Sequence, residues 1–562
     1  MQKNIALLLS VILLSVAQIQ AQQAVSIAVD LNKVKGKMEP VWAWFGCDEP
    51  NYAYMKDGKK LLTELGQIKP SVPVYFRAHN MLTTGDGSAS FKWGSTNAYT
   101  EDANGNPIYN WKIVDSIFDT YLARGIKPMA EVGFMPQALS TKPEPYRHNW
   151  KPGDPYGSIY TGWAYPPKDY NKWAALVFEW VKHAVERYGK AEVESWYWEL
   201  WNEPDLAYWR GTRQEFFKLY DYTADAIKRA LPTAKVGGVD GTGPLGRLSG
   251  YRLLEGFLQH VLRDTNYVTG KIGAPLDFIT FHAKGAPSVV RGHVRMNLGV
   301  QMRAVNNGFE LVSTFPELKH LPIIIGESDP EGCAACGMHT NPENAYRNGT
   351  MFSSYTAAAF ARKYELADYY KVNFIGAVSW AFEFEDQPWF HGFRDLATNG
   401  VDKPVLNVFR MYGKMGGQRV ETSGNMAYDF LRVRDSSVRR EADINALASY
   451  EKKTASVMVW NYHDDDLPAP PSPVSITIKN IPAKKALLTH YRIDDKHSNS
   501  YEVWKKMGSP QQPSPEQIKE LEKAGQLALL EAPKTVKLKD GVAEMQMELP
   551  RKGVSLLQLT WK

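Results

Sequence analysis

Two glutamates in this sequence stand where acid–base and nucleophilic chemistry could take place. Glu203 lies near the end of "SWYWELWNEPD" (195–205), an aromatic-rich run that is typical of a strand and is stopped by Pro204. Glu327 comes at the end of an apolar run within residues 322–329. A pair of carboxyl groups can hydrolyse a glycosidic bond, because one protonates the leaving oxygen while the other attacks the anomeric carbon or activates water. This chemistry requires a fold that brings two distant parts of the chain together.

Elements that could do this alternate along residues 41 to about 415. Strand-like apolar runs are separated by segments with helical periodicity, and in residues 170–189 the apolar side chains recur every three to four positions. Eight such runs predict a (β/α)8 barrel of the α/β class, because no glycine-rich phosphate loop follows the first run, as a nucleotide-binding open sheet would require. The runs cover residues 41–49, 74–80, 127–136, 195–205, 234–241, 277–285, 322–329 and 374–386.

Polar side chains follow nearly every one of these strand-like runs. The carboxyl ends of the strands of such a barrel meet at one rim, where the active site forms. Asn202 could hydrogen-bond a sugar hydroxyl, while Arg77 and His79 could either contact substrate or brace the rim by pairing with Glu131. Glu199 lies earlier on its strand, so we expect it to be a buried structural acid. The residues expected at the rim are Asp48, Arg77, His79, Glu131, Asn202, Glu203, His282, Lys284, Glu327 and Glu383.

The flanking regions predict a second domain and an export signal. Residues 419–562 contain short alternating strands set off by turn residues, which predicts an accessory β-sandwich with a helical insertion near 514–530. Residues 24–40 could add strands to this sandwich, and residues 22–418 are expected to form the catalytic barrel. Residues 1–21 combine a lysine, a short apolar stretch and a small final residue, which is typical of a secretory signal peptide. We therefore expect a periplasmic or secreted protein with no membrane insertion after cleavage.

The composition is that of a globular protein with more than one domain. The 562 residues are 44% hydrophobic and 23% charged, and their net charge of +5 is small for this length. No block of basic residues indicates a nucleic-acid partner, and we expect neither a cofactor nor a metal. Cys333 and Cys336 could form a local disulfide or remain inert thiols, which we favour over a fragment of a metal site.

Both glutamate motifs, together with several other segments, resemble glycoside hydrolase family 39 in clan A of the retaining glycosidases. "WELWNEPD" looks like the acid/base motif of the family and "IIIGESD" like its nucleophile motif. "VYFRAHN" and "KPMAEVGFMP" resemble its second and third strands, and "FHGFRDLATNGVDKPVLNVF" the segment after its eighth strand. The resemblance covers nearly the whole chain after residue 21. It implies that Glu203 is the acid/base, that Glu327 is the nucleophile, and that Trp380 forms a sugar platform through a cis non-proline bond.

The substrate that the resemblance implies is a terminal sugar of a plant-type or other oligo- or polysaccharide. The family comprises mainly β-xylosidases and α-L-iduronidases, and we expect a β-xylosidase or related pentosidase first and a uronidase second. "FHAKGA" (281–286) and "GFRDL" (392–396) look more like the iduronidase branch, in which Lys284 and Arg394 would bind a sugar carboxylate. Alternatively, these cations pair with rim acids: Lys284 with Glu383 or Glu385, and Arg394 with Asp395 or Asp386. A non-catalytic carbohydrate-binding barrel is a third possibility, which the loss of either glutamate would have favoured.

Overall fold

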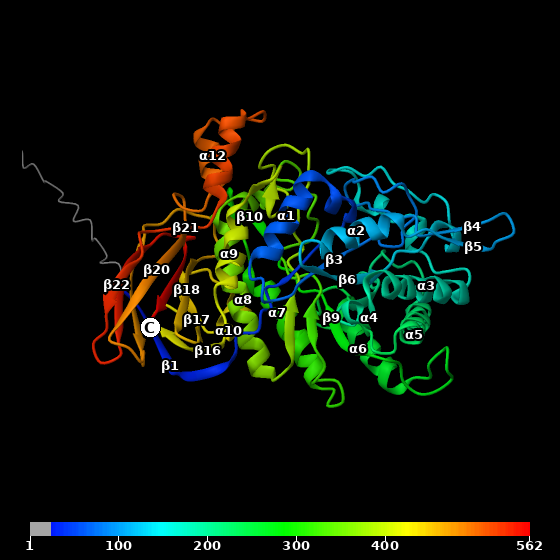
Figure 1. Cartoon of the computed structure of the whole chain (residues 1–562), viewed down its shortest axis with the longest axis horizontal. Helices are drawn as coiled ribbons and strands as arrows, with labels where there is room; N and C mark the ends of the chain where they lie inside the picture. The colour runs from blue at the N-terminus through cyan, green and yellow to red at the C-terminus, as the bar shows by residue number, and fades with distance from the viewer. Residues whose placement is uncertain (1–23) are drawn as a thin grey trace, which may run out of the picture.

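The computed structural model describes residues 24–562 and arranges them in two parts along the long axis of the molecule (Figure 1). One part is a parallel β-barrel surrounded by helices, and the other is a large curled β-sheet. The predicted signal peptide, residues 1–21, lies outside the described residues. Among residues 24–562, no helix combines the length and the apolar character needed to cross a membrane.

The barrel confirms the predicted α/β fold class. Its eight strands run parallel, and a bridge between Phe45 and Ser379 joins the first strand to the segment that follows the last. The strands are shorter than the runs predicted from the sequence, and most end before the polar residue that closes the run, although Arg77 and Glu131 lie within their strands. The strands are β2 (Trp44–Cys47), β3 (Val74–Ala78), β6 (Ile126–Val132), β7 (Tyr197–Leu200), β8 (Lys235–Gly238), β9 (Phe278–Phe281), β12 (Ile323–Ile325) and β13 (Phe374–Ala377).

Amphipathic helices cover the outside of the barrel. The α3 helix begins at Asp169, whose side chain accepts hydrogen bonds from two backbone N–H groups of the first turn, and its buried face includes Trp173 and Trp180. The α5 helix begins with a capping box between Thr212 and Glu215. The helices are α1 (Lys56–Gln67), α2 (Lys112–Leu122), α3 (Tyr170–Tyr188), α4 (Lys190–Val193), α5 (Arg213–Ala230), α6 (Ser249–Arg263), α7 (Leu298–Ser313), α8 (Thr350–Tyr370) and α9 (Pro404–Gly413).

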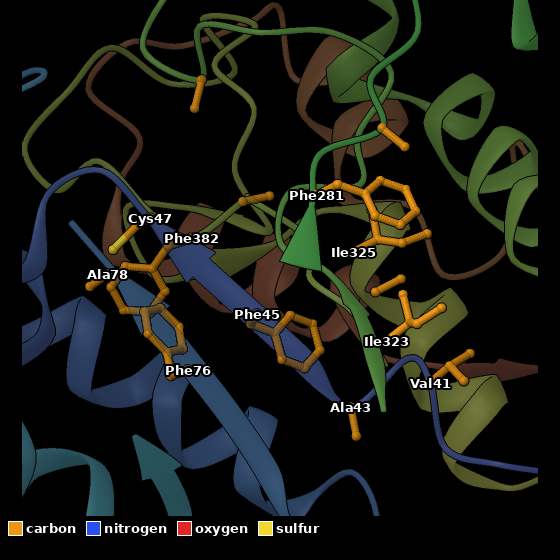
Figure 2. Close-up of a cluster of buried hydrophobic side chains, with 14 of the residues drawn as sticks. Val41, Ala43, Phe45, Cys47, Phe76, Ala78, Phe281, Ile323, Ile325 and Phe382 are labelled. Carbon is orange, nitrogen blue, oxygen red and sulfur yellow. The ribbon is translucent and has the colours of Figure 1, made fainter. Parts of the chain in front are cut away.

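Alternate side chains of each barrel strand point to opposite faces. On β2, β3, β9 and β12, one set packs outward against the helices; Phe45, Phe76, Phe281 and Ile323 belong to this set (Figure 2). The inward set near the amino ends of the strands forms a separate apolar cluster that includes Trp44 and, stacked on it at 4.2 Å, Tyr75. Two residues further along β3, the inward position carries a charge, and this change sets the floor of the site.

The second part is one hydrogen-bonded sheet that curls around its own apolar core. The first strand, β1 (Val25–Lys37), pairs antiparallel with β16 (Gln418–Gly424) and parallel with β19 (Ser472–Lys479), so the start of the described chain belongs to this sheet. Its other strands are β17 (Asp443–Glu451), β18 (Thr454–Tyr462), β20 (Lys485–Ile493), β21 (Ala528–Leu529), β22 (Lys534–Lys537), β23 (Ala543–Leu549) and β24 (Val554–Thr560).

Short elements decorate both parts. The α11 (Ser500–Lys506) and α12 (Pro515–Gly525) helices lie between β20 and β21, and α12, which begins with a capping box at Ser514, projects from the molecule at the top of Figure 1. The α10 helix (Phe430–Ser436) follows β16. Small two-stranded ladders are formed by β4 (Tyr99–Glu101) with β5 (Pro107–Tyr109), β10 (Ser288–Val290) with β11 (His293–Arg295), and β14 (Ala397–Thr398) with β15 (Val401–Asp402).

Candidate active site

Glu203 and Glu327 meet at the carboxyl-end rim of the barrel. Glu203 lies three residues beyond β7 with a left-handed φ of 43°, and Glu327 lies two residues beyond β12. A carboxylate oxygen of one lies within 4.8 Å of a carboxylate oxygen of the other. Lys284, which follows β9, contacts both: its Nζ is 2.9 Å from Glu203 Oε1 and 2.6 Å from Glu327 Oε2. The rim therefore places an ammonium group between two paired carboxylates.

This ammonium determines the charge state of the two glutamates. Burial raises the pKa of Glu203, but Lys284 and the hydrogen bond from His282 outweigh burial and lower it to about 2. Burial acts in the same direction on Glu327, yet Lys284, His282 and His79 hold its pKa well below its usual range. With Lys284 in this position, both carboxyl groups are ionised at neutral pH.

His282 joins Glu203 to a carboxylate that sequence reasoning missed. Its Nδ1 lies 2.8 Å from Glu203 Oε1, and its Nε2 lies 3.0 Å from Asp240 Oδ2. Burial lowers the pKa of His282, but Asp240 and Glu327 raise it to about 10, so a cationic imidazole donates to Glu203 and forms an ion pair with Asp240. Asp240 comes two residues after β8, and the same strand-end pattern that indicated the other candidates could have found it.

Arg77 and Asn202 brace the floor of the site. Arg77 is fully buried and pairs with Glu131 at 2.8 Å and with Glu199 at 2.5 Å. It also contacts Asp240 and donates to Asn202 Oδ1 at 3.2 Å. Of the two roles considered for Arg77, these contacts fit bracing. Glu199 is completely buried, as expected for a structural acid.

The acids around Arg77 are not all ionised. Burial raises the pKa of Glu131 to about 7, although His79 and Arg77 oppose it, and raises the pKa of Glu199 to about 8. The pKa of Asp240 stays below its usual value, because Arg77 and His282 outweigh its burial. Partial protonation of Glu131 and Glu199 thus limits the excess of negative charge beneath the rim.

A second charged group surrounds Asp48, the residue after β2. His79 Nδ1 lies 3.1 Å from Asp48 Oδ1, the Trp380 indole donates to the same oxygen at 3.1 Å, and the Lys92 ammonium pairs with the other. Burial lowers the pKa of His79, but Glu131 and Asp48 raise it to about 9. Lys92 belongs to the long loop after β3, far from any strand end, so no local signal indicated it.

Trp380 corrects one expectation. The non-proline cis bonds of residues 24–562 are at Gly133–Phe134 and Gly238–Val239, so the cis bond expected at Trp380 is wrong. The backbone N–H of Trp380 donates to Asp329 Oδ2 at 2.8 Å, while the indole holds Asp48.

The rim surrounds a cavity of about 430 Å³. Six of the candidates line it, whereas Arg77, His79, Asn202 and His282 lie behind this lining and act through the groups they contact. Three tyrosines on loops, Tyr156, Tyr160 and Tyr208, also line it and escaped sequence reasoning. The six candidates that line the cavity are Asp48, Glu203, Lys284, Glu327, Trp380 and Arg394.

Lys284 and Arg394 both pair with acids at the rim, but the partners named for them from the sequence are wrong. Lys284 pairs with the two rim glutamates described above rather than with Glu383 or Glu385. Arg394 Nη1 lies 3.0 Å from Glu331 Oε1, and Arg394 Nε donates to the carbonyl oxygen of Trp380 at 3.0 Å. Glu331 lies in the loop after β12, which lines the cavity.

The wall of the cavity contains a disulfide between Cys333 and Cys336, one of the two states favoured for these residues. Two groups of side chains nearby have the ligand types of a metal site, and each shares Glu327: one adds Asp48 and His79, the other Glu203 and His282. Lys92 and Lys284 contact oxygens of these same groups and supply positive charge there.

A (β/α)8 barrel that joins two carboxylates at its carboxyl-end rim is the architecture of an O-glycosyl hydrolase. The model of the family "Glycosyl hydrolases family 39" matches residues 25–541, and the chain therefore belongs to this family of glycosidases. A carbohydrate is accordingly its substrate.

Relatives with two activities align with the chain. A β-xylosidase from Geobacillus stearothermophilus is 27% identical over 503 residues, which cover 86% of each chain. An α-L-iduronidase from Mus musculus is 27% identical over 372 residues, which cover 62% of this chain and 56% of the relative. The crystal structure of a monomeric β-xylosidase from Caulobacter crescentus CB15 superposes with a TM-score of 0.72 at 21% identity and covers 95% of this chain and 99% of the other. This last likeness establishes the shared fold.

Proposed function

We propose that this protein is a retaining, exo-acting glycosidase, most simply a β-xylosidase or related pentosidase. The observation that carries the mechanism is the closeness of Glu203 and Glu327, whose nearest carboxylate oxygens lie within 4.8 Å. Retaining enzymes hold the two carboxyl groups about 5–5.5 Å apart, whereas inverting enzymes keep about 6.5–9.5 Å to admit a water molecule. The short separation in this site supports retention.

In the proposed reaction, the Glu327 carboxylate attacks the anomeric carbon while Glu203 gives its proton to the departing oxygen. This step breaks the glycosidic bond and forms a glycosyl ester on Glu327. Glu203, now ionised, takes a proton from water as the water oxygen attacks the same carbon and releases Glu327. Both steps invert the anomeric carbon, so the product keeps the configuration of the substrate.

Glu203 can act as an acid only after Lys284 moves. While Lys284 bridges the pair, it holds the pKa of Glu203 at about 2, far too low for an acid that must carry a proton near neutral pH. Displacement of the ammonium by a sugar would leave two carboxylates close together, and their repulsion favours protonation of one. We infer that substrate binding moves Lys284 away from Glu203 and thereby prepares the acid.

The charges in the cavity favour a neutral sugar. Its three cations, Lys92, Lys284 and Arg394, already pair with carboxylates of the protein, which leaves none in excess for a sugar carboxylate. A uronide is the second candidate, because the Lys284 side chain is 22% exposed and can turn toward a ligand, whereas Lys92 and Arg394 are 5% and 1% exposed.

Hydrolysis of a panel of aryl glycosides tests this proposal. The panel comprises xyloside, arabinoside, glucoside, galactoside, glucuronide and iduronide. We expect the highest kcat/KM on the xyloside or arabinoside. A higher value on either uronide would replace the pentosidase proposal with the uronidase, and no hydrolysis of any member would contradict exo-action on these sugars.

The site of action is also a proposal. We propose that residues 1–21 direct export and that the enzyme meets its glycan outside the cytoplasm. The disulfide between Cys333 and Cys336 supports this, because such bonds persist in oxidising compartments. Fractionation of the cells that make the protein, with amino-terminal sequencing of the product, tests it.

A further inference from the structure

The curled sheet contains a second cavity that is larger than the one at the barrel rim. Its volume is about 800 Å³, against about 430 Å³ at the rim. It opens among the ends of β20 and β23, the segments before β22 and β24, and the proline-rich loop after β18, on the β-rich part of Figure 1. Its lining includes Arg492, Asp495, Gln546, Met547, Glu548 and Arg551.

Arg551 lines this cavity without a partner. Its Nε is shielded from solvent and makes no hydrogen bond, and within residues 24–562 the side chain forms no ion pair. Burial alone lowers its pKa. A partly desolvated guanidinium without a counter-charge is unfavourable, and a carboxylate that enters the cavity could satisfy it with two parallel hydrogen bonds.

Most other charges that line the cavity are already paired within the protein. Arg492 pairs with Asp494 at 3.2 Å and donates to Ser555 and to the carbonyl of Glu548. Lys534 pairs with Glu531 at 2.7 Å, and Lys552 pairs with Asp466 at 2.6 Å. Burial and the neighbouring Arg492 lower the pKa of His490 to about 4, so this imidazole is neutral. Among the buried and half-buried cations that line the cavity in residues 24–562, Arg551 is therefore the one without a partner.

The mouth of the cavity has a different character. Asp495, Gln546 and Glu548 are exposed there, as is Lys496, which adds a second cation. Exposed carboxylates accept hydrogen bonds from hydroxyl groups, an exposed amide both accepts and donates them, and Met547 offers an apolar surface to a ring face. A single inorganic anion would not use these groups, whereas a sugar that carries one carboxylate would use both the mouth and the interior.

A connection between the two cavities follows from the β10–β11 hairpin. Pro287, which lines the active site, immediately precedes this hairpin. At its other end Arg295 pairs with Asp465 at 2.5 Å, and the next residue, Asp466, accepts from Lys552 at the rim of the second cavity. The same hairpin thus begins at one cavity and ends beside the other.

We propose that the second cavity is a non-catalytic binding site for an acidic sugar unit, whose carboxylate contacts Arg551 and whose hydroxyls contact Asp495, Gln546 and Glu548. It would hold an acidic side group of the same glycan whose terminal sugar enters the barrel. This second site rests on the proposed glycosidase function only because that function makes a saccharide the ligand.

Isothermal titration calorimetry with the full chain carrying Glu327→Gln, which prevents turnover, tests the site. The probes are methyl glucuronide, methyl xyloside and sodium acetate. We expect methyl glucuronide to bind, and Arg551→Ala to lower its affinity at least about tenfold. Arg551→Lys should lower the affinity less. Arg440→Ala, which changes an exposed arginine outside the cavity, should leave the affinity unchanged. Unchanged affinity in Arg551→Ala, or an equal Arg551-dependent affinity for acetate, would overturn the proposal.

Two controls separate this test from that of the catalytic site. Thermal unfolding should give the same midpoint for the Arg551 variants and their parent. With Glu327 intact, Arg551→Ala should hydrolyse a small aryl glycoside at the rate of the unmodified chain, since the cavity lies outside the barrel. Failure of the sugar to bind, with hydrolysis intact, would overturn the second site alone, whereas absence of hydrolysis by the unmodified chain would overturn the proposed function alone.

Discussion

The inside of the barrel has two layers of opposite chemistry on the same strands. Near the amino ends, the inward side chains are apolar, and Met129 and Tyr197 belong to one buried cluster, against which the half-buried Tyr75 packs. Two positions further along β3, β6 and β7, the inward side chains are Arg77, Glu131 and Glu199. A strand repeats every two residues, so one step of the pattern separates a hydrophobic layer from a buried ionic one.

The two layers contribute differently to stability. Apolar side chains stabilise the fold by leaving water, and each does so largely on its own. Buried charges cost several kcal/mol each, which only a complete set of partners offsets, so the loss of one member exposes the others to that cost. The apolar layer therefore supports the barrel. The ionic layer holds Glu203 and Glu327 in place, but the substitution of one of its members destabilises the protein.

The largest effect is expected at the chemical step itself. Glu327→Gln should lower kcat by at least about a thousandfold, because the amide cannot form the glycosyl ester. The fold should persist, as circular dichroism and thermal unfolding would show. Glu310→Gln, an exposed glutamate on α7, is the matched control and should keep full activity. Turnover of the purified Glu327→Gln protein at the unmodified rate would rule out Glu327 as the nucleophile.

Glu203→Ala should have a smaller and substrate-dependent effect. A leaving group that is already a stable anion needs no proton, whereas a sugar leaving group does. We expect kcat/KM to fall by about a hundredfold or more on a natural disaccharide and far less on an activated nitrophenyl glycoside. Equal losses on both substrates would argue against an acid role for Glu203.

The comparison of the two layers predicts different pH dependences of stability. Arg77→Leu leaves buried acids without their cation and should lower the free energy of unfolding by about 3–5 kcal/mol at pH 8. Folding raises the pKa values of Glu131 and Glu199 above 4.5, to about 7 and 8, so their ionisation costs stability as pH rises through this range. Removal of Arg77 increases that cost, and the loss should be smaller at pH 5.

Two variants serve as references for Arg77→Leu in denaturant unfolding at pH 5 and 8. Phe278→Ala in the apolar layer should cost a comparable amount, about 3–5 kcal/mol, at both pH values. Arg187→Leu removes an exposed ion pair with Asp119 and should cost less than about 1 kcal/mol. Equal losses for Arg77→Leu at the two pH values would show that the two layers do not differ in the way described.

The smallest expected effect concerns the pH profile. Lys284 lowers the pKa of Glu203, so Lys284→Ala should raise it, and the acid should remain protonated to higher pH. The alkaline limb of kcat/KM, which reports the free enzyme, should therefore move upward by about one pH unit or more. A limb that stays in place, or moves downward, would show that Lys284 does not control the acid.

The pattern of polar residues at the strand ends predicted much of the site. It placed Glu203, Glu327 and His282 at one rim, because the polar residues after parallel strands must converge there. It would also have found Asp240, whose approach to Gly326 leaves no space for a side chain at that position. The barrel and the strands of the second part followed from the change from alternating elements to short strands.

What the sequence did not indicate depends on long loops and on competition among charges. Lys92 and the three tyrosines reach the cavity from loops whose paths are set by packing rather than by periodicity. The sequence offered several rim acids as partners for Lys284. Only the assembled rim determines that Lys284 contacts both Glu203 and Glu327. The single curled sheet likewise depends on the long-range pairing of β1 with β16 and β19.

The stereochemistry of the first product tests the central claim most directly. Proton NMR of an aryl glycoside hydrolysis, recorded in the first minutes before mutarotation, reports the configuration of the released sugar. The placement of Glu203 and Glu327 with oxygens within 4.8 Å predicts a product with the same anomeric configuration as the substrate. A product of opposite configuration would contradict the double displacement and the roles assigned to both glutamates.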